Sequence, residues 1–353
     1  MTRTPAFEAV VGGPAGGPRR ILVWILKFAA AALVLWLAVR MASRIGWEGL
    51  AERLTTADPL LTATGIALLV VRYVAWGIRW GRAARHFEES RRAMRRFWAV
   101  CASVLINHAT PSIRIFGSLL RARYLARGGR ASVVPQYAVV LYEQMVHMIV
   151  STAIFWLAGT GIAWLLGFRL AAGASLAAGL AGLAWLFHRR RRGRRWRESP
   201  WLEITKRRIW SLTHRLPPLA MHGRELVGDV ARLIADRSLR PSVVLWTVVF
   251  SASNLGAQWV LFHALGLSVS PFAVAGVIGA GTVVGALTGS PGGLATTEAA
   301  MTAGYVALGV GQVDAAAATL LYRGLHYLVV LGCGAPALFY FEIIERRNRP
   351  SGL

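Results

Sequence analysis

Apolar residues gather in long runs along the chain, separated by short segments rich in arginine. A run of about 20 apolar residues spans the roughly 30 Å hydrocarbon core of a bilayer as a helix. Six runs are long enough, at residues 21–39, 60–81, 133–157, 168–187, 242–265 and 316–341. The pattern therefore predicts an all-α polytopic membrane helix bundle with six full spans.

Two further apolar segments are interrupted by residues that break helices. Residues 97–120 are interrupted at Asn107 to Pro111, and residues 272–310 at Ser290 to Gly293. Non-helical backbone at membrane depth is tolerated only where protein or a water-filled cavity satisfies its polar groups. We therefore expect two re-entrant helical hairpins inside the bundle. For the second break, a plain kink with Glu298 facing an aqueous loop is the alternative.

Basic residues set the expected orientation in the membrane. The net charge is +24, yet only two of the 40 basic residues are Lys, and nearly all of them flank apolar runs. Lys/Arg excess marks cytoplasmic loops, and seven of the ten residues from 188 to 197 are Arg. Both termini and the 188–240 loop are therefore predicted to be cytoplasmic, in a plasma-membrane protein that binds no nucleic acid.

The charge pattern also suggests the domain limits. Residues 1–20 are rich in Gly and Pro and are predicted to be a disordered cytoplasmic tail, residues 21–345 a single transmembrane domain, and residues 346–353 a second cytoplasmic tail. Within the 188–240 loop, apolar residues at helical spacing oppose charged ones. The apolar set is Leu226, Val227, Val230, Leu233 and Ile234, and the charged set is Arg224, Asp229, Arg232 and Asp236. This amphipathic helix lies either on the membrane surface or against the underside of the bundle.

The two interrupted segments align at an offset of 180 residues without a gap. Pro111 falls on Pro291, and Leu141-Tyr142 falls on Leu321-Tyr322. Because the first hairpin opens to the cytoplasm and the second to the outside, the alignment predicts an inverted-topology repeat, which places paired broken helices at a midplane site. The N-termini of the half-helices would then direct their positive dipole ends toward an anionic group.

The same offset makes Glu143 and Arg323 equivalent, each directly after a Leu-Tyr pair. In an inverted repeat both would lie at similar depth near the bundle centre. An unpaired ion at that depth is costly, so the alignment predicts a direct Glu143–Arg323 ion pair. The alternative is that each faces a separate watery vestibule. Arg79, near the end of its span, is expected to extend to the cytoplasmic face.

These residues resemble the membrane region of the lysylphosphatidylglycerol synthase and flippase-like family, over most of the chain. The matching motifs are Arg79-Trp80, Asn107, Pro111, Gly117 to Arg121, Ala264 to Leu267, Pro291-Gly292-Gly293 to Glu298, Gly309-Val310 and Leu321-Tyr322-Arg323. Where the family often carries an acidic residue in the first hairpin, this chain has Ser118. Synthases of the family carry an additional cytoplasmic aminoacyl-transferase domain, so the resemblance implies the lipid-handling membrane module alone.

The leading functional hypothesis is a protein that binds or translocates a lipid between leaflets: an anionic or aminoacylated phospholipid, or a polyprenyl-linked carrier. A headgroup phosphate needs a cationic path, and carboxylates would balance charge or hold an amine. The candidate lipid-binding residues are Arg72, Asn107, Pro111, Arg114, Glu143, Asn254, Pro291, Gly292, Gly293, Glu298 and Arg323. Each arginine has the alternative role of a structural partner to a carboxylate or carbonyl.

Two other classes of function remain open. A membrane-embedded transferase on a lipid-linked substrate is the first, but the sequence offers no Ser-His-Asp grouping, phosphate-cradling glycine loop or metal-ligand spacing. His108, His147, His263 and His326 are interpreted as scattered, hydrogen-bonded core residues. The second class is an accessory subunit of a cell-envelope assembly. We expect no catalytic residue, metal or cofactor, and membrane lipids as partners, with a homo-oligomer or an envelope-assembly partner as further options.

Overall fold

The computed structural model describes residues 47–87, 93–110, 115–126, 133–191, 217–288 and 293–344, and every element in these ranges is helical. The first half contains α3 (Trp47–Thr55), α4 (Pro59–Ala84), α5 (Ala93–Ala109), α6 (Ile115–Ala126), α7 (Val133–Leu165) and α8 (Arg169–Arg191). The second contains α10 (Pro217–Ala235), α11 (Leu239–Ala264), α12 (Pro271–Thr288), α13 (Thr296–Ala307), α14 (Gln312–Phe339) and the π-helical turn η3 (Tyr340–Ile344). The all-α prediction is confirmed.

Four described helices are long and apolar enough to cross a bilayer, namely Pro59–Ala84, Val133–Leu165, Leu239–Ala264 and Gln312–Ile343. They contain four of the six predicted spans. The predicted span at 168–187 falls within α8, which does not meet the same criterion, and the span at 21–39 lies outside the described residues. The count of six spans thus stays a prediction.

Large apolar side chains cover the outside of the long helices. Met148 and Ile149 on α7, Leu245 on α11 and Leu328 on α14 are all more than half exposed. A protein in water rarely exposes apolar surface on this scale, whereas hydrocarbon solvates it without cost. The outer surface is therefore suited to lipid contact, while the polar groups described below lie inside.

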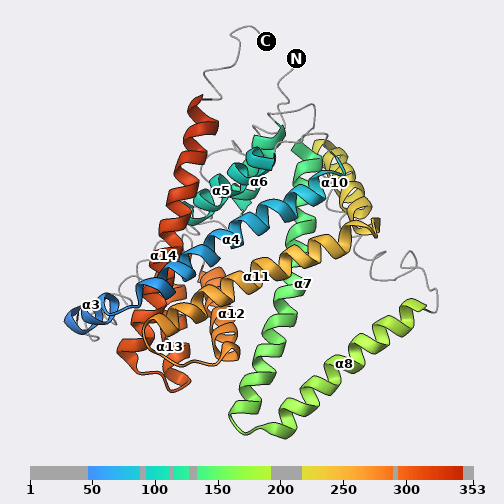
Figure 1. The fold of residues 1–353 in the computed structure, drawn as a ribbon. Helices are drawn as coiled ribbons and strands as arrows, with labels where there is room; N and C mark the ends of the chain where they lie inside the picture. Colours follow the sequence, from blue (N-terminus) through green and yellow to red (C-terminus); the bar gives the residue numbers. More distant parts are fainter. Residues whose placement is uncertain are drawn as a thin grey trace, which may run out of the picture.

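The helices α4 and α11 lie side by side and run in opposite directions through the middle of the bundle (Figure 1). Asp58 caps α4 by accepting a hydrogen bond from Leu61 N at 2.8 Å, and its own N–H donates to Ala264 O at the end of α11. A Cβ at Gly65 would come within 2.8 Å of Leu261. The small residue thus lets the two helices approach closely.

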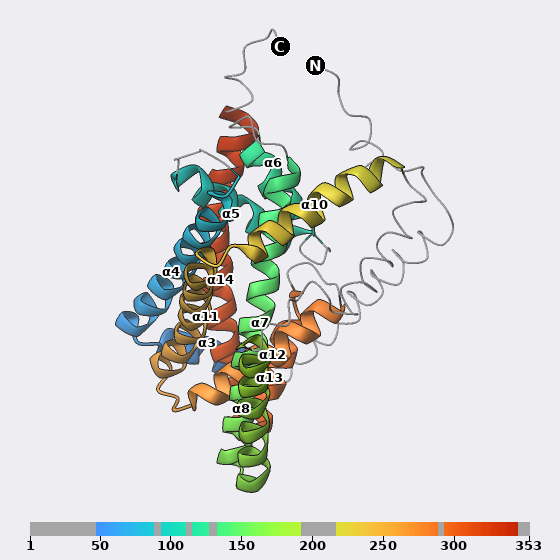
Figure 2. The ribbon, with the colours of Figure 1, turned by 90° about the vertical axis from the view of Figure 1, so that its right-hand side faces the viewer.

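The two helical hairpins lie at opposite ends of the bundle. Helices α5 and α6 are near one end, α12 and α13 near the other, and α7 and α14 run between these ends in opposite directions (Figures 1 and 2). Helix α8 packs against α7. All four hairpin helices have 18 residues or fewer. That length suits the predicted re-entrant hairpins, which stay a prediction.

Helix bounds recur at the offset of 180 residues seen in the sequence. Subtracting 180 from the bounds of α11, 239–264, gives 59–84, which are the bounds of α4. The same subtraction turns α12, α13 and the start of α14 into 91–108, 116–127 and 132, each within two residues of α5, α6 and the start of α7. Recurring bounds and opposite directions are what an inverted repeat predicts.

The amphipathic helix predicted in the 188–240 loop is α10, and it packs against α7. Leu233 is fully buried, but Val227 and Ile234 are at least 40% exposed. Asp229, expected on the solvent face, is instead buried and pairs with Arg232 at 3.2 Å. At the end of α10, hydrogen bonds from the Ser238 hydroxyl and N–H hold the pKa of Asp236 below its usual value.

Candidate functional site

A row of polar side chains crosses the interior of the bundle, from α6 at one hairpin to α13 at the other. We call it the polar row. Its members are Arg72, Arg79, His108, Arg121, Glu143, Glu298, Arg323, His326 and Tyr327. Ionisable side chains inside a membrane bundle are costly to keep and usually mark a functional pathway.

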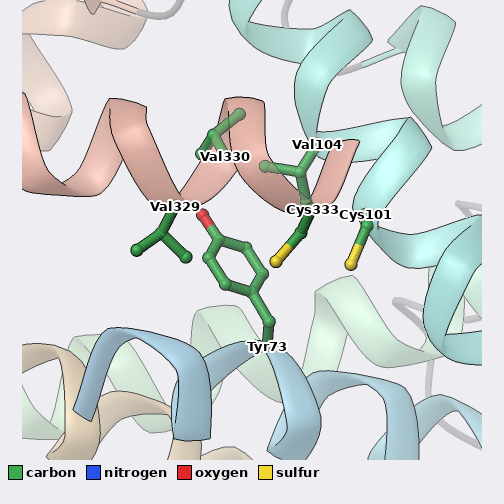
Figure 3. A pocket seen from close by; sticks show the side chains of 6 residues that line it. All are labelled: Tyr73, Cys101, Val104, Val329, Val330 and Cys333. Carbon is green, nitrogen blue, oxygen red and sulfur yellow. The ribbon is translucent and has the colours of Figure 1, made fainter. Parts of the chain in front are cut away.

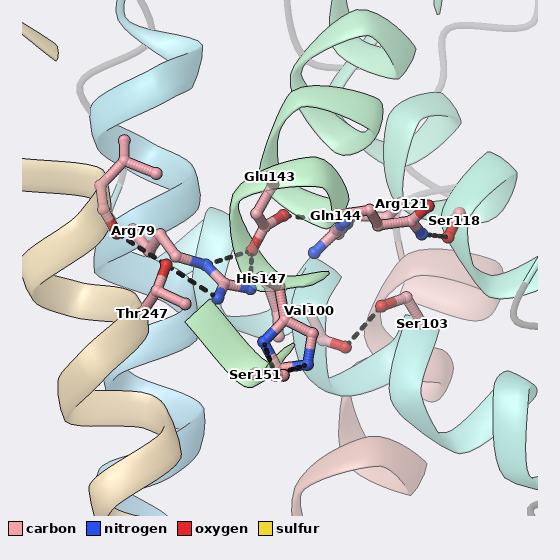
Figure 4. Close-up of polar contacts among 11 residues, drawn as sticks. Arg79, Val100, Ser103, Ser118, Arg121, Glu143, Gln144, His147, Ser151 and Thr247 are labelled. Carbon is pink, nitrogen blue, oxygen red and sulfur yellow. Dashed lines mark hydrogen bonds and ion pairs between the residues drawn. The ribbon is translucent and has the colours of Figure 1, made fainter. Parts of the chain in front are cut away.

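One end of the row is an ion cluster of two arginines and one glutamate, drawn in Figure 4. Arg79 Nε donates to Glu143 Oε1 at 2.7 Å, and Arg121 Nη2 lies 3.0 Å from Oε2 of the same carboxylate. All three side chains are at most 3% exposed. Arg79 also donates to the Thr247 hydroxyl at 3.3 Å, which ties α4 to α11. We call these three residues the first ion cluster.

The first ion cluster carries one more positive than negative charge. Arg121 lies over the rings of Trp80 and Trp76, with its guanidinium carbon 4.8 and 5.3 Å from the ring centroids. Its Nε and Nη1 atoms are buried and have no hydrogen-bond partner among the described residues. Stacking on an aromatic face stabilises a guanidinium but leaves its N–H donors unsatisfied. The cluster is therefore short of hydrogen-bond acceptors.

The other end of the row is an ion pair between α13 and α14. Arg323 Nε donates to Glu298 Oε1 at 2.7 Å, with side chains 10% and 14% exposed. Tyr327 completes the group because it accepts from Arg323 Nη2 and donates to Glu298 Oε1 at 3.3 Å. Glu298 Oε2 is buried without a hydrogen-bond partner in the described part of the chain. We call this group the second ion pair.

The predicted direct pair between Glu143 and Arg323 is wrong, since each binds a different partner. In each half the charge is instead neutralised from the hairpin helix that precedes the long helix: Arg121 on α6 binds Glu143, and Glu298 on α13 binds Arg323. The equivalent positions of Glu143 and Arg323 at the 180-residue offset thus do not make them partners, because each pairs with side chains that packing brings closer. In the first half the long helix α7 supplies the carboxylate and the hairpin helix α6 the arginine, whereas in the second half α14 supplies the arginine and α13 the carboxylate.

Ser118 stands where Glu298 stands in the second half at the 180-residue offset. Gln144 Nε2, next to Glu143, donates to the Ser118 hydroxyl at 3.2 Å, so the first half holds this position with neutral groups. The first half therefore keeps a polar contact between α6 and α7 without a second carboxylate.

Two histidines link the ends of the row, which corrects their interpretation as scattered. His326 Nδ1 lies 3.2 Å from Arg72 Nη1, and its Nε2 lies 3.3 Å from His108 Nε2. Tyr327 contacts the His108 ring at 5.7 Å between centroids. The guanidinium carbon of Arg72 also lies 4.7 Å from the centroid of the Phe250 ring. The guanidinium carbon of Arg79, which is also on α4, lies 5.1 Å from the same centroid. We call His108 and His326 the histidine pair.

Polar side chains bind backbone groups of described residues beside both hairpin breaks. Asn107 Oδ1 accepts from Gly117 N at 3.0 Å across the first break. At the second, the Thr296 hydroxyl donates to Gly293 O at 3.1 Å. Gly293 has φ +71°, and a Cβ there would lie 2.3 Å from Thr297 Oγ1, so the position favours glycine.

The structure brings most of the predicted lipid-binding residues into or beside the polar row, but not all. Asn254 accepts from the Tyr322 hydroxyl at 2.7 Å and thereby joins α11 to α14 beside His326. Pro111, Arg114, Pro291 and Gly292 lie outside the described residues. The small pocket between Tyr73, Cys101 and Cys333 is too tight to admit a water molecule (Figure 3), so it is a packing contact.

The sequence model of the family described as lysylphosphatidylglycerol synthase TM region matches residues 24–334, which is most of the chain. The chain belongs to this family. It is also similar to a UPF0104 membrane protein of Methanothermobacter thermautotrophicus (strain ATCC 29096 / DSM 1053 / JCM 10044 / NBRC 100330 / Delta H), at 22% identity over 330 residues that cover 90% of this chain and 96% of that protein. The resemblance seen in the sequence is thereby confirmed, and the protein is a membrane protein.

In this member of the lysylphosphatidylglycerol synthase TM family, sequence reasoning missed six residues of the site, namely Arg79, His108, Arg121, Thr247, His326 and Tyr327. Arg79 was expected at the cytoplasmic face, yet it is buried against Glu143. Arg121 directly follows the interrupted apolar segment 97–120, where a basic residue is expected to flank the membrane, yet it is 2% exposed. Two signals were available in the family motifs Arg79-Trp80 and Gly117 to Arg121, and in the structure Arg121 lies over the Trp80 ring.

Proposed function

We propose that this membrane protein binds a phosphate-bearing lipid in its polar row and moves the headgroup between the two leaflets. The observation that carries the proposal is the surplus of positive charge in the row. Among the described residues of the row, four arginines, Arg72, Arg79, Arg121 and Arg323, face two carboxylates, Glu143 and Glu298, which leaves a surplus of two positive charges there.

An uncompensated charge at membrane depth costs at least about 2.5–3.5 kcal/mol on insertion scales. An anion that enters from the lipid phase offsets that cost, and a phosphate can accept paired N–H donors from one guanidinium. Arg121 has N–H donors without a described partner at Nε and Nη1, on opposite sides of its guanidinium, and an anion can bind at either one. A lipid phosphate is thus the ligand that the chemistry of the row fits best.

The carboxylates explain how an aminoacylated headgroup would fit the same row. Glu298 Oε2 has no hydrogen-bond partner in the described structure, so it can accept from an ammonium group without breaking its bond to Arg323. The family description names lysylphosphatidylglycerol synthase, and lysylphosphatidylglycerol carries both a phosphate and amines. An anionic phospholipid and a polyprenyl phosphate would use the arginines alone.

Leaflet exchange in reconstituted vesicles tests the proposal. Purified protein is placed in vesicles that carry fluorescent phosphatidylglycerol, lysylphosphatidylglycerol or a polyprenyl phosphate, and a membrane-impermeant quencher reports the rate at which each lipid changes leaflet. We expect faster exchange than in protein-free vesicles for at least one of these lipids. Exchange equal to that of protein-free vesicles for all three would overturn it.

The same preparation separates the proposal from the two alternatives. Turnover of a lipid-linked donor by the detergent-solubilised protein, without leaflet exchange, would favour a transferase. Neither turnover nor exchange would favour an accessory subunit of an envelope assembly.

A further inference from the structure

Arginine and aromatic side chains alternate in a stack that follows α4 across the bundle. Each guanidinium carbon in it lies 4.7–5.9 Å from the centroids of the neighbouring rings. A cation within about 6 Å of a ring centroid is attracted by the electron-rich face of the ring. The ring faces thus help to keep the guanidinium groups inside the bundle. We call this the arginine–aromatic stack, and its order is Trp80, Arg121, Trp76, Arg79, Phe250 and Arg72.

Stacking occupies the faces of these groups, whereas their N–H donors point outward in the plane of each ring or guanidinium. Around Arg121, four donor nitrogens are buried and have no hydrogen-bond partner among the described residues, namely Trp76 Nε1, Trp80 Nε1, Arg121 Nε and Arg121 Nη1. Because both rings contact the Arg121 guanidinium, these donors gather in one part of the bundle. Buried donors are rarely left unpaired, so the four favour a ligand that accepts hydrogen bonds.

The acceptor side chains described beside these donors already have partners. Glu143 binds Arg79 through Oε1, and its Oε2 lies 3.0 Å from Arg121 Nη2. The Thr247 hydroxyl accepts from Arg79 and donates to Val243 O. Two arginines and one carboxylate leave this described group with one surplus positive charge. A water molecule would bring donors of its own, whereas a phosphodiester is negatively charged and only accepts. A phosphate group therefore matches both the surplus donors and the surplus charge.

Trp76 is the indole that an anion can reach more easily. Its side chain is only partly buried, whereas Trp80 is 0% exposed. Arg121 Nε and Nη1 lie on opposite sides of the guanidinium, so an anion binds one of them and needs a further donor from a neighbour. One turn before Trp76 on α4, Arg72 Nε is also buried without a described partner. Unpaired N–H donors thus continue from Arg121 past Trp76 to Arg72.

We propose that Trp76 is a direct ligand of a phosphate group, to which its indole N–H donates together with an N–H of Arg121. This deepens the proposed function, on which the lipid as the source of the phosphate rests. Free inorganic phosphate has the same chemistry, so the experiment includes both sources. The prediction is specific to the N–H group, because a benzene ring at position 76 would still offer an aromatic face to Arg79 and Arg121.

Nitrogen NMR of the tryptophan indoles in the detergent-solubilised full chain tests the contact itself. The spectra compare wild type with Trp76→Phe and Trp259→Phe, since the signal lost in each variant identifies that residue. Trp259 is the matched control because its Nε1 already donates to Val269 O at 3.0 Å. The probes are phosphatidylglycerol, inorganic phosphate and an uncharged glycolipid with the same acyl chains as the phosphatidylglycerol.

We expect phosphatidylglycerol to shift the Trp76 indole proton downfield and to leave the Trp259 signal in place, and the glycolipid to shift neither. A shift with phosphatidylglycerol but not with inorganic phosphate assigns a lipid headgroup to the site. A shift with inorganic phosphate as well supports a site for phosphate from either source. A Trp76 signal that moves with neither phosphate probe, or that moves equally with the glycolipid, would overturn the proposal.

The affinity for phosphatidylglycerol, measured by native mass spectrometry, tests what the N–H contributes. Trp76→Phe should bind about tenfold more weakly than wild type or worse, as expected for one lost hydrogen bond to a charged group, and Trp259→Phe should bind like wild type. A second variant carries benzothienylalanine at position 76, which keeps the shape of tryptophan but has sulfur in place of the N–H. It should show the same loss, so the test holds even where Trp76→Phe does not fold. Wild-type affinity of the benzothienylalanine variant would overturn the proposal.

The leaflet-exchange vesicles separate this proposal from the proposed function. A Trp76 shift without any leaflet exchange would contradict lipid movement and leave the phosphate site standing. Leaflet exchange of phosphatidylglycerol without a Trp76 shift would support lipid movement and contradict the site.

Discussion

At the residue scale, the first ion cluster concentrates three charges in a space that is nearly closed to solvent. Glu143 neutralises Arg79 and Arg121 at once, and all three side chains are at most 3% exposed. Removing one partner of a buried ion pair leaves an uncompensated charge, which is far more costly than breaking an exposed pair. Burial therefore makes Glu143 the carboxylate on which the folded state depends most.

Replacing Glu143 with Gln should destabilise the protein by about 3–5 kcal/mol, because two buried guanidinium groups then lose the carboxylate that pairs with both of them in the described structure. The matched control is Arg53→Gln, which breaks the Arg53–Asp314 pair, whose side chains are 41% and 27% exposed. That control should cost about 1 kcal/mol or less. Unfolding in detergent measures both, and equal losses would contradict the assigned role of Glu143.

Glu298→Gln should lower lipid exchange by about tenfold or more while the protein stays folded. The second ion pair is less buried than the first ion cluster, and Arg323 keeps its contact with Tyr327 when the carboxylate is lost. Exchange in vesicles and thermal unfolding in detergent, both compared with Arg53→Gln, provide the measurements. Wild-type exchange by a folded variant would remove Glu298 from the lipid path.

At the element scale, the hairpins depend on close approach of small residues. A Cβ at Gly117 would lie 2.1 Å from Ser103 O and 2.4 Å from Asn107 Oδ1, and neither α5 backbone nor the capping amide can yield without loss of the hairpin contact. By contrast, a Cβ at Gly324 on α14 would meet no atom within 4 Å. The two glycines thus make a matched pair.

Gly117→Ala should lower the unfolding temperature measurably, since α6 must move away from α5 to admit the methyl group. Gly324→Ala should leave the temperature unchanged or raise it, because alanine favours helix over glycine by about 1 kcal/mol. Thermal unfolding of both variants in the same detergent is the measurement. Tolerance of alanine at Gly117 would mean that α5 and α6 do not pack as described.

Helix positions could be predicted from the sequence because apolar run length decides them. The run at 60–81 became α4 at 59–84, and the run at 242–265 became α11 at 239–264. Ion partners could not be predicted, because partner choice depends on which side chains packing brings within about 3 Å. Arg121 illustrates this limit: its sequence context matches a cytoplasmic loop, yet its helix packs inward and buries it against Glu143.

At the scale of the whole molecule, α4 and α11 run in opposite directions, as do α7 and α14, and the helix bounds recur at an offset of 180 residues (Figures 1 and 2). The inverted repeat that these features favour stays a prediction. Such an arrangement can present the same row to either side of a membrane with small changes in helix packing. The surplus of arginine among the described residues of the row is the feature on which the proposed binding of an anionic headgroup rests.

Single cysteines test the predicted orientation of this bundle. With Cys101 and Cys333 replaced by serine, a cysteine at Gly49 should react with an impermeant thiol reagent in intact cells, and one at Ser199 should react only after lysis. That result would place the 188–240 loop in the cytoplasm and position 49 outside, as predicted. Labelling of position 199 from outside, or protection of position 49, would reverse the orientation.

The most direct test of lipid movement through a cationic row compares two labelled lipids in the same vesicles. One is phosphatidylglycerol, and the other is an uncharged glycolipid with the same acyl chains. The account predicts that wild-type protein exchanges phosphatidylglycerol at least about tenfold faster than the glycolipid, equivalent to about 1.4 kcal/mol of selectivity. Equal rates for the two lipids, or no exchange of phosphatidylglycerol above protein-free vesicles, would contradict it.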